Sequence, residues 1–254
     1  MKVSALQKNR KGGFTLIELM VVIGILAALA SIGYGPILDH MNDGDRQKAN
    51  SNLKSLHTVL QGFKTDHGSF PCDATAERLQ EEKPDLNFGS LTGDNSNAYF
   101  RQVYYSASNV SEKPFFAKIN CNGLVVNKEG DEKLANGAAL SRGENAMAYV
   151  MRKNNEDPTL KDGVTKSNAP IAICGIYPSV TPYTGDQIVF DGTSFRGHAF
   201  VLSCDGSVKD LEGTIEEDEN DEAKYILPTG KSLFPETKKG RSTADGYLVL
   251  SPEK

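Results

Sequence analysis

A long apolar run near the amino terminus constrains the fold of this chain more than any other feature. It extends from Phe14 to Leu38 in a sequence of 254 residues, and Glu18 is the only charged residue within it. A helix of about 20 apolar residues spans a bilayer, so the run is long enough to cross a membrane. An isolated carboxylate is costly in hydrocarbon and is normally paired. The sequence therefore predicts a membrane helix in which Glu18 has a specific role.

The residues before the run set its orientation. Four basic residues and no acidic residue occur within the first eleven positions. Basic flanks stay on the cytoplasmic side, so we expect a single pass through the inner membrane, with the rest of the chain periplasmic or extracellular. A secretory signal peptide carries small residues after its apolar core. Here Gly12 and Gly13 precede the core, so the ordinary secretory pattern is not met.

The stretch KGGFTLIELMVVIGILAALA, residues 11–30, resembles the class III signal of type IV pilins and type II secretion pseudopilins. In that family a prepilin peptidase cuts after the glycine and methylates the new amino terminus. The resemblance implies cleavage between Gly13 and Phe14, N-methylation of Phe14, and a match of Glu18 to the family's glutamate. It also implies three partners: the prepilin peptidase, a secretion or pilus assembly platform, and further copies of the chain.

The same resemblance gives a reason for the carboxylate in the apolar run. Cleavage leaves a cationic amine on Phe14, one helical turn from Glu18. In the low dielectric of a helix bundle, the Phe14 amine of one subunit can pair with Glu18 of its neighbour, and only at matched axial register. In this interpretation Glu18 sets the axial register between neighbouring subunits during assembly. The alternative is a glutamate that snorkels toward the head groups near the helix start.

Beyond the apolar run the pattern turns amphipathic. Apolar residues recur at spacings of three and four from Ala49 to Phe63, which is one face of a helix. The glycines and the proline at residues 33–36 predict a kink or an unwound turn, while Gly68 and Pro71 predict the helix end. Such a helix is roughly 80 Å long, so its front half must face lipid or other copies.

Residues 46–71 carry a narrower resemblance, to the major pseudopilins of type II secretion. There a leucine-rich helical face is followed by an aromatic residue, an Asp, a Gly, a second aromatic residue and a Pro. The matching residues in this chain are Phe63, Asp66, Gly68, Phe70 and Pro71.

The rest of the chain is predicted to form a globular domain. We expect residues 72–122 to be loop-rich and residues 139–154 to form a short helix. Asp205-Gly206 predicts a tight turn. The strand signals lie at residues 170–177, 187–192, 198–204 and 247–250. The expected class is α+β, with the long amino-terminal transmembrane and amphipathic helix packed on a small antiparallel β-sheet, as in pilins.

The chain therefore divides into four predicted segments. The first is a prepilin leader at residues 1–13, and the second is a transmembrane helix at residues 14–38. An amphipathic continuation of the helix follows at residues 39–68. The exported globular domain, with its sheet near the carboxyl end, occupies residues 69–254.

The four cysteines, Cys72, Cys121, Cys174 and Cys204, all follow the apolar run. They contain no CxxC pair, so a zinc site is not expected. An even number of cysteines in an exported chain suggests disulfides. We favour Cys72–Cys121 and Cys174–Cys204, because these pairings close the shorter loops. If the domain stayed in the cytoplasm, four reduced buried thiols would be the better interpretation.

No pattern in the sequence indicates catalysis, nucleic-acid binding or a cofactor. The net charge of −5 gives no basic footprint for nucleic acid, and Walker, dinucleotide and GxSxG motifs are missing. We expect all four histidines, which form no HExxH pair, to face solvent. The acidic run Glu216 to Glu222 suggests either a calcium site or a solvated loop, and no metal ligand is assigned.

The expected function is structural and not enzymatic: a subunit of a pilus-like filament, in particular a type II secretion pseudopilin that assembles after prepilin peptidase cleavage. Two alternatives stay open. One is a type IV pilus subunit for adhesion, motility or DNA uptake. The other is a membrane-anchored binding or hydrolytic domain that uses the prepilin signal only for export.

Overall fold

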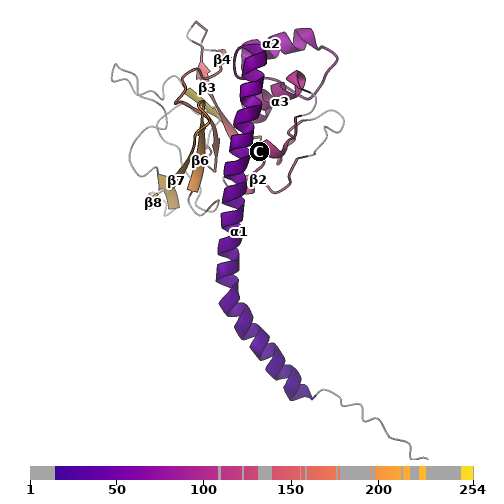
Figure 1. The fold of residues 1–254 in the computed structure, drawn as a ribbon, viewed down its shortest axis with the longest axis vertical. Coiled ribbons are helices and arrows are strands. Elements are labelled where there is room, and N and C mark those ends of the chain that lie inside the picture. The colour runs from indigo at the N-terminus through magenta and orange to yellow at the C-terminus, as the bar shows by residue number, and fades with distance from the viewer. Residues whose placement is uncertain are drawn as a thin grey trace, which may run out of the picture. The chain divides into compact units, whose positions relative to one another are not determined.

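The computed structural model describes most of the chain beyond the predicted leader (Figure 1). The described backbone covers residues 15–107, 110–121, 123–130, 139–154, 156–157, 159–175, 177, 195, 198–212, 214–217, 223–226 and 247–253. Side chains at residues 30–39, 121 and 212–226 are outside the described set. The chain divides into two compact units, Met1–Asn42 and Asp43–Lys254.

The first element, α1, is a single helix of 52 residues, Leu16–His67. The sequence predicted either a kink or an unwound turn at residues 33–36; α1 stays helical there, so the unwound turn is not formed. Its end is where the sequence predicted it: Gly68 adopts φ +80° and its N–H donates to the carbonyl oxygen of Lys64. Among the described residues, no helix reaches both the length and the apolarity of a membrane span. Part of the expected span lies outside the described side chains.

The segment after α1 is helical where loops were expected. It forms α2 (Asp73–Glu82), α3 (Ser96–Ser106) and the short 3-10 helix η1 (Lys113–Phe115). The side chain of Asn95 caps α3 by accepting from the N–H of Ala98. Tyrosines supply much of the buried face of α3, including Tyr99 and Tyr104. Tyrosine has an aromatic ring and a hydroxyl, so a sequence pattern can count it as either apolar or polar. For this reason the helical periodicity of α3 was missed.

The globular part is built on antiparallel strands. The main sheet has the order β10-β3-β5-β6-β7, and β4 adds to the end of β3. Its strands are β3 (Met147–Lys153), β4 (Lys161–Asp162), β5 (Pro170–Cys174), β6 (His198–Ser203), β7 (Val208–Glu212) and β10 (Tyr247–Leu250). Two separate hairpins pair β1 (Ile119–Cys121) with β2 (Leu124–Val126), and β8 (Thr214–Glu217) with β9 (Ala223–Ile226).

The expected helix at residues 139–154 is wrong, because its second half is β3, an interior strand of the sheet. The first five residues of β3 are all buried, so the strand lacks the alternation that distinguishes a half-exposed strand from a helix. The predicted strands at the start of β5, at β6 and at β10 are confirmed, as is the turn at Asp205-Gly206, where Gly206 has φ +87°. The strand predicted at residues 187–192 lies outside the described residues.

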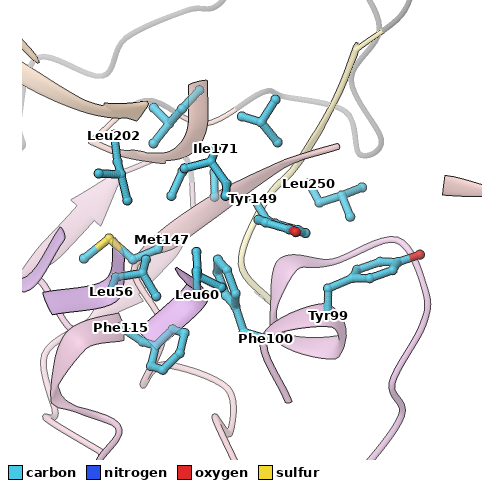
Figure 2. Packing of buried hydrophobic residues seen from close by; sticks show 14 of the residues in the cluster. Leu56, Leu60, Tyr99, Phe100, Phe115, Met147, Tyr149, Ile171, Leu202 and Leu250 are labelled. Atoms are coloured by element: carbon cyan, nitrogen blue, oxygen red, sulfur yellow. The ribbon is translucent and has the colours of Figure 1, made fainter. Parts of the chain in front are cut away.

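The core lies between the sheet and the rear half of α1 (Figure 2). Leu56 and Leu60 are fully buried beside strand residues such as Met147 and Leu202. Aromatic rings continue this core, with the Phe100 centroid 4.9 Å from Tyr149 and 5.0 Å from Phe115. Removing a buried leucine side chain of this kind costs about 2–5 kcal/mol of stability. The protein is therefore α+β, and the amphipathic face predicted from Ala49 onward is the face that packs.

Candidate functional site

Thr15 and Glu18 form a reciprocal set of hydrogen bonds at the start of α1. Thr15 immediately precedes α1, and its backbone N–H and its hydroxyl both donate to Oε2 of Glu18, each at 2.8 Å. The backbone N–H of Glu18 lies 3.4 Å from the Thr15 hydroxyl oxygen. This is a capping box, in which residues three apart satisfy each other's exposed groups at a helix start. The sequence carries its Thr-x-x-Glu signature, which the interpretation of Glu18 overlooked.

Oε1 of Glu18 is not engaged by Thr15. Among the described residues, none donates a hydrogen bond to this oxygen. The capping box thus uses one carboxylate oxygen and holds the other beside the amino-terminal end of α1. Gly13 and Phe14, the predicted cleavage and methylation sites, lie outside the described residues.

The front of α1 is covered by exposed apolar side chains. From Leu16 to Leu29 the large apolar residues are between 46% and 76% exposed, and Glu18 is the only charged residue among them. They are Leu16, Ile17, Leu19, Met20, Val21, Val22, Ile23, Ile25, Leu26 and Leu29. A helix that is apolar on all sides is normally buried in lipid or among other helices. This surface therefore needs an apolar environment that one copy of the chain does not provide.

The rear of α1 is fixed to the sheet by a charged cluster. Nη2 of Arg46 lies 3.0 Å from Oδ2 of Asp210 on β7 and 3.0 Å from Nδ1 of His198 on β6. His198 in turn lies 2.8 Å from Oδ1 of Asp210. The expectation that this histidine faces solvent is wrong, since its side chain is only 18% exposed. The cluster joins α1 to two strands, and Cys204 lies beyond the opposite end of β6 from His198.

His57 and His67 also make specific contacts within the fold. Nε2 of His57 lies 3.2 Å from the carbonyl oxygen of Cys204, and Nε2 of His67 lies 2.9 Å from the hydroxyl of Ser106. In the part of the chain that the structure describes, no three histidine, cysteine or acidic side chains gather as metal ligands would. The acidic run predicted as a calcium site or a solvated loop lies outside the described side chains.

The register of the sheet overturns one predicted disulfide. Cys174 is directly opposite Phe200, and Cys204 lies four residues further along the same chain direction. At about 3.3 Å per residue this separates the two cysteines by about 13 Å along the sheet, whereas a disulfide joins Cα atoms within about 7 Å. Cys174 and Cys204 accordingly form no disulfide. Loop length was a poor criterion for this pair because β5 and β6 are antiparallel. Cys174 at the end of β5 and Cys204 after the end of β6 therefore lie toward opposite ends of the strand pair.

In the other predicted pair, Cys72–Cys121, only the side chain of Cys72 is described by the structure. The Cys72 thiol is free and buried in the structure, and the side chain of Cys121 is outside the described set. The thiol of Cys72 lies at the start of α2, 3.5 Å from the hydroxyl of Thr75 and 3.6 Å from that of Ser69.

Comparison with known proteins places the recognisable part of the chain at its amino end. The family described as the prokaryotic N-terminal methylation motif matches residues 8–34. The type II secretion system core protein G of Aeromonas hydrophila is 41% identical over 66 residues, which are 26% of this chain and 46% of that protein. The same protein of Klebsiella pneumoniae is 42% identical over 72 residues, 28% of this chain and 50% of that protein.

The core protein G of Escherichia coli K12 is 36% identical over 78 residues, 31% of this chain and 54% of that protein. The chain thus spans about half the length of the curated relatives it matches. No solved structure matches significantly. The resemblance to the pilin and pseudopilin signal is confirmed: the chain carries the prokaryotic N-terminal methylation motif, and its matching region is similar to type II secretion system core protein G.

Proposed function

We propose that this chain is a structural subunit of a pilus-like filament, and specifically a type II secretion pseudopilin. A prepilin peptidase removes residues 1–13 and methylates Phe14, and the front of α1 anchors the subunit in the inner membrane until assembly. The domain formed by the later residues is then exported and has a pilin-like arrangement of a long helix on an antiparallel sheet. The relatives named as type II secretion core protein G favour secretion over the type IV pilus alternative.

The observation that carries the proposal is the combination of the capping box with the exposed apolar front of α1. Ten large apolar side chains surround a single carboxylate, and Thr15 engages only one oxygen of that carboxylate. The other oxygen is left for a cation supplied from outside the chain. The amine that cleavage would create on Phe14 of a neighbouring copy has the required charge.

The energy of this pairing depends on the environment that the helices create. Two unit charges 4 Å apart attract by about 4 kcal/mol at an effective dielectric constant of 20. Because the carboxylate and the amine are at fixed places near the start of each helix, the attraction is gained at one axial offset and lost at others. Apolar packing of the helix fronts is non-directional, so the charge pair supplies the register.

The experiment that tests the proposal compares the wild type with Gly13→Leu. Mass spectrometry of the membrane fraction should find a wild-type chain that begins at a singly methylated Phe14. Gly13→Leu should retain residues 1–13, because the peptidase needs a small residue before the cut, and electron microscopy should find no filaments of it. Gly12→Ala keeps a small residue at the neighbouring position and is the matched control, expected to mature normally. A wild-type chain that starts elsewhere would contradict the proposal.

A further inference from the structure

One ring nitrogen in the charged cluster of Arg46, His198 and Asp210 has two neighbours with conflicting demands. Nδ1 of His198 lies 3.0 Å from Nη2 of Arg46 and 2.8 Å from Oδ1 of Asp210. A guanidinium only donates hydrogen bonds, and an ionised carboxylate only accepts them. Nδ1 can accept from Arg46 or donate to Asp210, but it cannot do both at once. The location of the imidazole proton therefore decides which contact is a hydrogen bond.

The cluster has two hydrogen-bonding arrangements. With Nδ1 unprotonated, Arg46 donates to it, and Oδ1 of Asp210 faces a nitrogen lone pair. With Nδ1 protonated, it donates to Oδ1 of Asp210, while Nη2 of Arg46 keeps its hydrogen bond to Oδ2 at 3.0 Å. Each carboxylate oxygen then accepts from a different donor. Both nitrogens of an imidazolium carry protons, so protonation of His198 selects this second arrangement.

The described charges around His198 favour a proton on it. On α1, Arg46 carries one positive charge, and Asp43 carries a negative charge 3.6 Å from Nη1 of Arg46. On β7, Asp210 carries a second negative charge. One positive and two negative charges leave an excess of one negative charge, which a protonated His198 balances. Opposite charges nearby favour the charged form of a titratable group.

The remaining elements around His198 do not change this balance. β5, the other neighbour of β6, carries no acidic or basic residue, and its titratable group is the thiol of Cys174, opposite Phe200. Glu212 is directly opposite His198 on β7, and Arg196 precedes His198 by two residues. The side chains of Glu212 and Arg196 lie outside the described set, and their charges are opposite.

The cluster lies in the first turns of the globular unit, which begins at Asp43. The side chains of Arg46 and His198 are 26% and 18% exposed, and that of Asp210 is 41% exposed, so water reaches the cluster without unfolding. A cavity of about 250 Å³ borders it and is lined by Asp43, Arg46, Gln47, Asn50, Phe200 and Asp210. An Arg46 side chain that is held less firmly therefore has space to move.

We propose that Arg46, Asp210 and His198 form a proton-dependent clamp, which holds the rear of α1 against β6 and β7 more tightly when His198 is protonated. The imidazolium and the guanidinium then bind separate oxygens of one carboxylate. Both hydrogen bonds are charge-assisted, and such bonds are stronger than neutral ones. When His198 loses its proton, Asp210 keeps one charged donor. The inference concerns the folded domain and does not depend on the proposed function.

The response to the proton should stay local. Ala49 and Leu53 follow Arg46 by about one and two helical turns and are fully buried, so apolar packing holds the rest of α1 in either state of His198. β7 is the last strand in the order of the main sheet, and Asp210 is its only contact in the clamp. Loosening should therefore appear in the amides of β7 and of residues 43–50.

The test is amide hydrogen exchange of the purified full chain in detergent, at about pH 5.5 and about pH 8, a range in which histidine changes its charge. The wild type is compared with His198→Gln at each pH, so the intrinsic pH dependence of exchange cancels. The wild type should protect the β7 amides better than His198→Gln, and this advantage should be about three- to tenfold greater at the acidic pH.

Two further variants assign the effect to the cluster. Asp210→Asn keeps the histidine but removes the carboxylate, so it should show the same acid-specific loss of protection as His198→Gln. His40→Gln removes an exposed histidine of α1 outside the cluster and should show no such loss. Wild-type protection in Asp210→Asn at the acidic pH would overturn the proposal.

The proposal is also overturned if His198→Gln differs from the wild type by the same factor at both pH values. A larger difference at the alkaline pH would overturn it too, because the unprotonated nitrogen would then be what holds Arg46. A measurement on the wild type alone does not require that a variant folds. Raising the ionic strength at the acidic pH should lower the protection of β7, because salt screens partly exposed charges. Protection that salt leaves unchanged would contradict a clamp built on charge.

Discussion

The hydroxyl and the backbone N–H of Thr15 both donate to the same oxygen of Glu18. The Glu18 side chain therefore caps the start of α1 within its own chain. In the proposed filament it also pairs with the Phe14 amine of a neighbouring subunit. The two roles use different properties of the carboxylate. Capping needs an acceptor oxygen, which a neutral amide also supplies, whereas pairing with an amine needs the negative charge.

Glu18→Gln separates these roles. We expect it to retain the cap with Thr15, to be cleaved and inserted normally, and to lose most of the filament yield because the charge is gone. Glu18→Leu should lose filaments to the same extent. Thr15→Ser keeps the hydroxyl and serves as the control with near-normal assembly. The measurement is the yield of sheared filaments at matched subunit level and matched leader cleavage. Normal yield from Glu18→Gln would remove the pairing role and favour the snorkelling alternative.

Two buried tyrosines should respond oppositely to loss of the hydroxyl. Among the described residues the Tyr104 hydroxyl has no hydrogen-bond partner, whereas that of Tyr149 donates to Pro71. Tyr104→Phe should be neutral or stabilising, because a buried unsatisfied group is removed. Tyr149→Phe should lower the free energy of unfolding by about 1–3 kcal/mol, because it leaves a buried carbonyl oxygen without its donor. Denaturant unfolding of both variants measures the difference, and equal losses would contradict the assignment.

Two glycines with nearly equal φ angles differ in what surrounds them. A Cβ at Gly206 would lie 2.8 Å from Cε1 of His57, whereas a Cβ at Gly68 would meet nothing within 4 Å. Gly68→Ala should cost only the left-handed conformation, about 1–2 kcal/mol. Gly206→Ala should cost clearly more, because the His57 ring must also move and its contact with Cys204 is disturbed. The unfolding midpoints of the two variants provide the comparison, and equal costs would show that the ring yields freely.

Asp205 gives the β6–β7 turn a defined acid response. Hydrogen bonds from the hydroxyl and the backbone N–H of Ser207 lower its pKa below the ordinary aspartate value. A lowered folded-state pKa adds stability above the unfolded-state pKa, and this stability is lost as pH falls through the folded-state pKa. Ser207→Ala should therefore raise the pKa of Asp205 and make the turn less sensitive to acid. Carboxyl titration by NMR measures this, with Asp157 beside Thr159 as an unaltered internal reference.

The parts of the fold that the sequence predicted well are those with local signals. The apolar face from Ala49 to Phe63, the stop at Gly68 and the Asp205-Gly206 turn each depend on a few neighbouring residues, and the structure confirms them. The strand at Met147–Lys153 was misassigned because burial on both faces removes the alternation that marks a strand. Its identity is set by its neighbours β5 and β10, which are distant in sequence.

The candidate site shows the same division between local and distant information. Glu18 was identified from its apolar surroundings, and its cap could have been identified from Thr15 three residues earlier. The charged cluster of Arg46, His198 and Asp210, by contrast, was missed because it depends on the pairing of β6 with β7 and on their contact with α1, which no spacing along the chain reveals.

The position of β10 has a consequence for the order of events in the life of the subunit. Residues 247–250 pair with β3, whose own strand begins about a hundred residues earlier. The sheet is therefore incomplete until the ribosome has released residue 250, long after the apolar run of α1 has emerged. In the proposed pseudopilin, the apolar run is therefore available for membrane insertion before the domain is complete. A chain truncated before β10 would leave the outer edge of β3 (Met147–Lys153) unpaired, and an unpaired edge is a template for pairing with another chain.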